Sequence, residues 1–158
     1  MGMIIGLIAI VVSLVIVYSF YPYILNFENV LEMYGLRVLN DKFGSMISDE
    51  EYEVIAAKID VNVPEESKAD TKVLLTGSVA EGMLEECMQK LRQQMEKLGI
   101  NVIQSSFLKE KPDEMKKLKQ VEQVVLVEQL GTTRFENLAW EVALCEDSGK
   151  KIAGVLFV

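Results

Sequence analysis

The sequence predicts an α/β fold in which an apolar N-terminal helix precedes a small domain with a parallel sheet of about four strands and flanking helices. Two observations support this prediction. The first 25 residues contain no charged side chain. From residue 72 onward, short apolar runs alternate with longer segments whose apolar residues keep helical spacing. Strands that are separated by helices pair in parallel through right-handed crossovers, so the alternation predicts a parallel sheet.

The N-terminal segment Met3–Ile24 is apolar enough and long enough to cross a bilayer core of about 30 Å as a helix. Tyr18, Tyr21 and Tyr23 cluster at one end, as an aromatic belt does. A cleaved signal peptide is the alternative, but it normally has a basic start and a small-residue cleavage site. We therefore predict a single transmembrane helix over residues 3–24.

The orientation of this helix is predicted from charge and cysteine usage. No basic side chain precedes the span, whereas Arg37 and Lys42 follow it, which favours a cytoplasmic C-terminal side. Cys87 and Cys145 lie far apart in the chain, and we interpret them as buried, unpaired thiols in a reducing compartment.

Residues 26–70 are predicted to form a juxtamembrane helical segment and a linker. Asn26 is placed to cap a short helix that ends near Gly35. The stretch Ser48–Glu51 has capping-box form and opens a second short helix. The polar stretch Val63–Asp70 contains a proline, and we place the domain boundary there, with the main domain over residues 71–158.

The main domain is predicted from six apolar segments. The predicted strands cover residues 72–77, 100–106, 121–129 and 151–158, and the predicted helices cover 81–99 and 133–149. The lysine-rich segment 109–120 is predicted to be a loop or a short exposed helix.

The turn between the first strand and the first long helix has the glycine spacing of a phosphate-binding loop. Gly77 and Gly82 match the pattern G-x-x-x-x-G-K-[ST]. In that pattern the lysine neutralises phosphate and the hydroxyl holds magnesium, but Met83 and Leu84 occupy these two positions. We predict a P-loop-like topology without a nucleotide site; an ordinary strand-to-helix turn is the alternative.

The composition excludes several classes of function. The net charge of −8 argues against nucleic acid as the main partner. The absence of histidine removes the usual general base and the commonest zinc ligand. Glu128 ends the third strand, but a lone carboxylate does not predict magnesium chemistry. We therefore predict no catalytic residue, no cofactor and no metal.

Four further stretches form a recognisable pattern: FENVLEMYGLRVL, VLLTGSVAEG, VVLVEQLGTTRFENL and KKIAGVLF. This pattern resembles the bacterial inner-membrane polysaccharide co-polymerases fused to tyrosine kinases. Gly131, Thr133 and Arg134 match the G-x-T-R turn of the family. The chain departs from the family at the loop lysine and hydroxyl, and it has no counterpart of the first transmembrane helix, the extracytoplasmic domain or the tyrosine-rich tail.

The resemblance implies a non-catalytic, pseudokinase-like adaptor or regulator in capsule or exopolysaccharide assembly, anchored in the bacterial cell membrane. A co-polymerase or kinase subunit is the expected partner, and an oligomer is compatible with the family. Thr133, Arg134 and Trp140 are the candidate contact residues. A solvated Arg134 and a packed Trp140 are the plainer alternatives.

Two other functions stay open at this point. One is a membrane-tethered protein-interaction module with no link to polysaccharide. The other is a divergent nucleotide-binding ATPase or kinase, which would need a lysine from elsewhere, such as Lys109 or Lys111, and a magnesium ligand such as Glu128.

Overall fold

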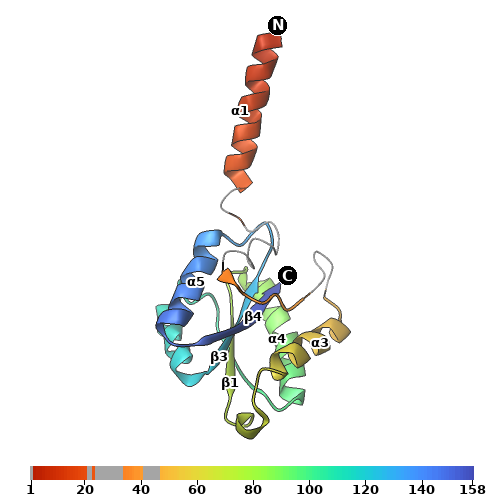
Figure 1. Cartoon of the computed structure of the whole chain (residues 1–158), viewed down its shortest axis with the longest axis vertical. Coiled ribbons are helices and arrows are strands. Elements are labelled where there is room, and N and C mark those ends of the chain that lie inside the picture. Colours follow the sequence, from red (N-terminus) through yellow and green to blue (C-terminus); the bar gives the residue numbers. More distant parts are fainter. Residues whose placement is uncertain (1, 21–22, 24–33, 41–46) are drawn as a thin grey trace.

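The fold is taken from a computed structural model that describes residues 2–20, 23, 34–40 and 47–158. Most of the helix predicted to start at Asn26 lies outside the described residues. Figure 1 shows an N-terminal helix that extends away from an α/β domain. The helices are α1 (Gly2–Phe20), α3 (Asp49–Asp60), α4 (Glu81–Lys97) and α5 (Phe135–Asp147), with 3₁₀ helices η1 (Glu65–Ser67) and η2 (Pro112–Gln120). The strands are β1 (Lys72–Thr76), β2 (Asn101–Gln104), β3 (Gln123–Glu128) and β4 (Lys151–Phe157).

The four strands form one parallel sheet with the order β2-β1-β3-β4. The chain leaves β1 through α4 to reach β2 on one side, and it leaves β3 through α5 to reach β4 on the other side. The sequence predicted this α/β sheet because each strand is a short apolar run that ends where helical spacing begins.

Helices cover both faces of the sheet. On one face, α3 and α4 pack on Val125 and Val127 of β3; on the other, α5 and η2 pack on Val124 and Leu126. Successive side chains of a strand point to opposite faces, so a strand covered on both sides needs a continuous apolar run. This explains why every residue of β3 is buried.

Residues 37–40 extend the sheet beyond β4. The Leu39 N–H donates to the Val155 carbonyl (2.9 Å), and the Val155 N–H donates to the Arg37 carbonyl (2.8 Å). The Asn40 side chain donates to the Phe157 carbonyl (2.6 Å) and accepts from the Phe157 N–H (3.0 Å). This stretch, which the sequence analysis assigned to the juxtamembrane segment, therefore pairs directly with the last strand of the domain.

One apolar cluster takes residues from both sides of the polar stretch at residues 63–70. The Ser48 capping box forms as expected and starts α3. Ile55 and Ile59 of α3 are buried in the same apolar cluster as Leu91 and Met95 of α4. Residues on both sides of the predicted boundary thus build one hydrophobic core.

The prediction of a transmembrane helix over Met3–Ile24 is wrong. The helix α1 ends at Phe20, and Tyr23 forms an antiparallel bridge with Arg134 at the start of α5. Its 19 residues extend about 28 Å, slightly less than a bilayer core of about 30 Å. Among the described residues, no helix combines the length and the apolar character that a membrane span requires. The single-pass membrane location and the cytoplasmic orientation rested on this span and are withdrawn with it.

Candidate functional site

The turn after β1 is shaped by Gly77. A Cβ atom at Gly77 would lie 1.8 Å from the Val127 carbonyl oxygen, so a glycine is required for this close approach of β1 and β3. The helix α4 begins at Glu81, which places Gly82 inside its first turn. A Cβ at Gly82 would meet no atom within 4 Å. Only one of the two glycines of the loop pattern is therefore sterically required.

The turn lies at the position where open α/β sheets usually bind ligands. That position is the crevice outside the carboxyl ends of two adjacent strands whose connections leave in opposite directions. In this sheet the two strands are β1 and β3. The crevice is occupied by side chains of the protein itself.

Glu128, at the end of β3, accepts the hydrogen bonds of this crevice. The Ser78 hydroxyl donates to Glu128 Oε2 (2.5 Å), and the Ser78 N–H donates to Oε1 (3.3 Å). The Thr133 hydroxyl donates to Oε2 (2.7 Å) and accepts from the Gln129 N–H (2.9 Å). A backbone N–H of the turn, which a phosphate loop would direct at its ligand, is therefore directed at an internal carboxylate.

A second buried acid, Glu141 of α5, lies next to Glu128. Burial and the neighbouring Glu128 charge raise the pKa of Glu141 well above its ordinary value. Burial also raises the pKa of Glu128, while the donors on Ser78 and Thr133 favour its charged form. Glu128 accepts three hydrogen bonds, whereas no donor reaches the Glu141 carboxyl among the described residues, so this arrangement favours a negative charge on Glu128 over one on Glu141. Neither acid has a salt bridge among the described residues.

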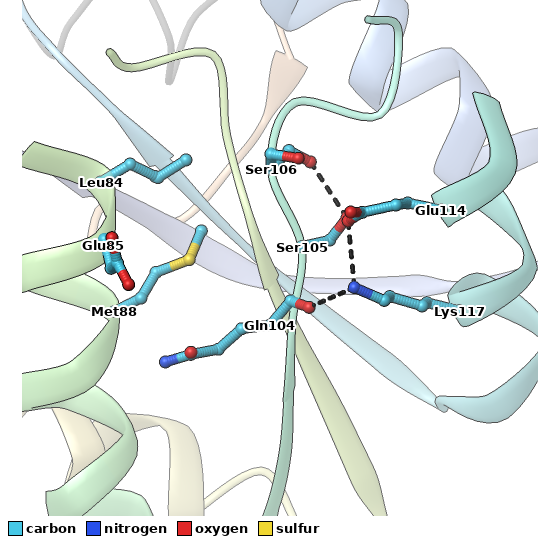
Figure 2. A pocket seen from close by; sticks show the side chains of 8 residues that line it. All are labelled: Leu84, Glu85, Met88, Gln104, Ser105, Ser106, Glu114 and Lys117. Atoms are coloured by element: carbon cyan, nitrogen blue, oxygen red, sulfur yellow. Dashed lines mark hydrogen bonds and ion pairs between the residues drawn. The ribbon is translucent and has the colours of Figure 1, made fainter. Parts of the chain in front are cut away.

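Two cavities in the described part of the chain share Leu84 and Ser106 in their walls. The smaller one, of about 140 Å³, lies against the turn; its lining residues are Ser78, Val79, Ala80, Leu84, Ser106, Phe107, Glu110 and Lys111. The larger one, of about 310 Å³, lies at the carboxyl end of the edge strand β2; its lining residues are Leu84, Glu85, Met88, Gln104, Ser105, Ser106, Glu114 and Lys117. In Figure 2, the α4 side chains stand on one side of the larger cavity, and the β2 and η2 residues stand on the other.

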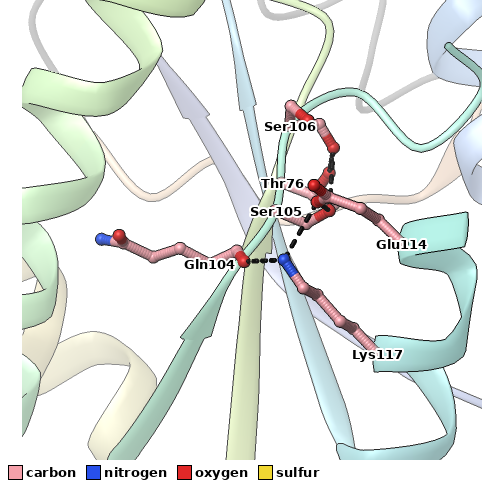
Figure 3. A network of polar contacts seen from close by, with 6 residues as sticks. All are labelled: Thr76, Gln104, Ser105, Ser106, Glu114 and Lys117. Atoms are coloured by element: carbon pink, nitrogen blue, oxygen red, sulfur yellow. Dashed lines mark hydrogen bonds and ion pairs between the residues drawn. The ribbon is translucent and has the colours of Figure 1, made fainter. Parts of the chain in front are cut away.

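The η2 side of the larger cavity is held by a polar network, drawn in Figure 3. Glu114 accepts hydrogen bonds from the Ser105 hydroxyl and from Lys117 Nζ (3.0 Å). Lys117 Nζ also donates to the Gln104 carbonyl (2.8 Å). The Ser105 hydrogen bond, supported by Lys117, lowers the pKa of Glu114. This network fixes η2 against the end of β2.

Apart from Leu84, the residues of this cavity were not singled out from the sequence. The sequence predicted a loop or a short exposed helix at η2, and it placed Gln104–Ser106 at the end of a strand. Two signals were present: a polar run directly after a strand, and Glu114 three residues before Lys117. Neither signal identifies the cavity without the position of α4.

The three residues predicted to contact a partner lie in different environments. Thr133 is buried and bonded to Glu128, whereas Arg134 is exposed and pairs with Glu136 (Nε–Oε1 3.2 Å). Trp140 is half-buried, with its ring edge-on to Phe107 at 6.0 Å between centroids. The role of these residues in binding a partner stays a prediction.

The two residues at the lysine and hydroxyl positions of the loop pattern lie in different environments. The Met83 side chain is exposed, whereas Leu84 is buried and lines both cavities. In the described part of the chain, no group of three or more acidic or cysteine side chains is placed to hold a metal ion.

No protein-family model, curated protein or solved structure matches this chain. The resemblance to the polysaccharide co-polymerase kinases therefore stays a prediction, and the site is interpreted from its own geometry.

Proposed function

We propose that this chain is a non-catalytic adaptor or regulator that acts by binding another protein. The observation that supports this proposal is the bonding of Ser78 to Glu128: the turn after β1 donates both its Ser78 hydroxyl and its Ser78 N–H to an internal carboxylate. Two donors of the turn are thus bonded to a side chain of the protein itself.

The charges of the turn support the same proposal. A nucleoside triphosphate needs a lysine and a magnesium ion to offset its negative charge. Here Met83 and Leu84 replace the lysine and the hydroxyl of the pattern. The buried Glu128 carboxyl beneath the turn offers no positive charge to a phosphate, and it already takes the two Ser78 donors.

The proposed setting is bacterial capsule or exopolysaccharide assembly, with a co-polymerase or kinase subunit as the partner. This part of the proposal rests on the resemblance between the turn that contains Gly131 and Arg134 and the G-x-T-R turn of that family. Arg134 immediately precedes α5 with an exposed side chain, a position that suits a polar contact at the rim of an interface.

The first test is a thermal-shift titration of the full chain with ATP and ADP, with and without magnesium. A ligand that binds only the folded state raises the melting temperature by mass action. We expect no shift at millimolar nucleotide. A magnesium-dependent rise of several degrees would contradict the proposal.

The second test measures partner binding directly, with a purified co-polymerase kinase as the probe. We expect the charge reversal Arg134→Glu to weaken the capture of that kinase by the full chain. Arg92→Glu is the matched control because Arg92 is also exposed but lies on α4. Equal binding by both variants would reject this surface. No capture of the kinase by the unmodified chain would reject this partner.

One observation favours a second candidate, a divergent nucleotide-binding domain. Lys111 lines the small cavity together with Ser78, Val79 and Ala80 of the turn. If the titration shows a shift, Lys111→Ala should remove it. Lys109→Ala should leave it unchanged, because Lys109 is exposed and does not line that cavity.

A further inference from the structure

The larger cavity has the features of a small-ligand site that is independent of the turn after β1. It lies at the carboxyl end of β2, the edge strand of the sheet, and its volume of about 310 Å³ is at the lower end of the usual range for ligand pockets. Leu84 and Met88, both buried, form an apolar wall on the α4 side. Polar groups form the opposite wall, as Figure 2 shows.

The polar groups of the cavity fall into two sets. Glu114, Lys117 and Ser105 satisfy one another through the η2 network (Figure 3). In contrast, Gln104 Nε2 and Ser106 Oγ are buried atoms with no hydrogen-bond partner in the described part of the chain. A buried polar atom without a partner is unfavourable, so a ligand that hydrogen-bonds to these atoms as their side chains turn toward the cavity would remove this cost.

The charges of the cavity limit the ligand. The Lys117 charge is paired with Glu114, and Glu85 contributes an exposed carboxylate from α4. Two carboxylates and one paired lysine disfavour a phosphate or another anion. A simple alkylammonium ion would satisfy Glu85 but would leave the Gln104 amide donor without an acceptor.

A hydroxyl group both donates and accepts, so the separate hydroxyls of one molecule can bond to the Glu85 carboxylate, the Gln104 amide and the Ser106 hydroxyl. The C–H face of such a molecule can pack on Leu84 and Met88. None of the lining residues is aromatic, so the cavity offers no stacking surface for a nucleobase. We propose that this cavity binds a neutral, polyhydroxylated molecule about the size of a monosaccharide.

The experiment is an NMR titration of the ¹⁵N-labelled full chain with D-glucose, D-galactose and D-mannose, each to tens of millimolar. Inorganic phosphate and ethylammonium serve as comparison ligands. We expect at least one sugar to give saturable shifts at the Gln104 side-chain amide and the Ser106 backbone amide. We expect phosphate and ethylammonium to leave these signals in place.

Two variants test the assignment, and one control accompanies them. Gln104→Ala and Glu85→Ala should each weaken sugar binding by about tenfold or more, because each removes a hydrogen-bonding group. Glu85 is exposed, so its variant tests binding without disturbing the core. Gln93→Ala is the control, because Gln93 is an exposed residue of α4 that does not line the cavity.

The proposal is overturned if none of the three sugars gives a saturable shift at these signals. It is also overturned if phosphate or ethylammonium binds there more tightly, or if both variants bind sugar as the unmodified chain does. The nucleotide titration is a separate readout, so the failure of either proposal leaves the other standing.

Discussion

The two glycines of the loop pattern should respond to alanine in opposite ways. At Gly77, the new Cβ would lie 1.8, 2.7 and 2.9 Å from the oxygen, carbon and nitrogen atoms of Val127, all of them backbone atoms. The β3 backbone is held in the sheet on both sides, so the turn has to move instead. That movement pulls Ser78 away from Glu128.

The size of the effect follows from these contacts. Overpacking costs about 1–3 kcal/mol, and the loss of a hydrogen bond to a charged group costs about 1.5–3 kcal/mol. We therefore expect Gly77→Ala to lower the free energy of unfolding by about 2.5–6 kcal/mol. This is a large part of the stability of a typical domain, about 5–15 kcal/mol.

Gly82→Ala is the matched control. A Cβ at Gly82 meets no neighbour, and the residue lies inside α4, so alanine should raise stability by about 0.5–1 kcal/mol through helix propensity. The assay is urea unfolding of the full chain followed by the fluorescence of Trp140, the only tryptophan. A Gly77→Ala cost below about 1 kcal/mol, or equal effects of the two variants, would refute the role of Gly77 in closing the crevice.

Two further predictions concern buried polar groups. Because the pKa of Glu141 is raised in the folded state, this residue contributes stability that is complete below its ordinary pKa of 4.5 and is lost as the pH rises towards the folded value. Glu141→Gln stays neutral, so it should be more stable than the unmodified chain at pH 7 but not at pH 4; equal stability gains at both pH values in urea unfolding would contradict this. Asn40→Ala should cost about 2–4 kcal/mol, because it removes two hydrogen bonds to Phe157 and leaves buried backbone groups without them. The control Asn101→Ala, at an exposed residue bonded to the Ala69 carbonyl, should cost about 0.5 kcal/mol in the same assay; a similar cost for both would argue against pairing of residues 37–40 with β4.

The candidate site was predictable only in part. The position of the turn was predictable from the glycine after β1. The sequence also showed that Met83 stands at the lysine position of the phosphate-loop pattern. The partners of the turn were not visible, because Ser78 and Glu128 are 50 residues apart in the chain. The pairing of Glu128 with Glu141 likewise depends on how α5 packs on the sheet, which no local pattern encodes.

The end of α1 shows the limit of a hydropathy argument. The apolar run continues past Phe20, so the sequence predicted a helix as far as Ile24. In the structure the helix ends at Phe20, and the Tyr23 backbone pairs with Arg134, more than a hundred residues later in the chain. Hydropathy measures how apolar a segment is, but the end of a helix also depends on which backbone groups can pair elsewhere.

The sequence by itself determined the alternation of strands and helices, the Ser48 capping box and the missing parts of the phosphate loop, because each depends on neighbouring residues. The tertiary structure alone decided three things: the pairing of residues 37–40 with β4, the buried pair Glu128 and Glu141, and the cavity between α4, β2 and η2. Each of these joins segments that are distant in the chain. Their energies come from burial and hydrogen bonding between segments, which local periodicity does not report.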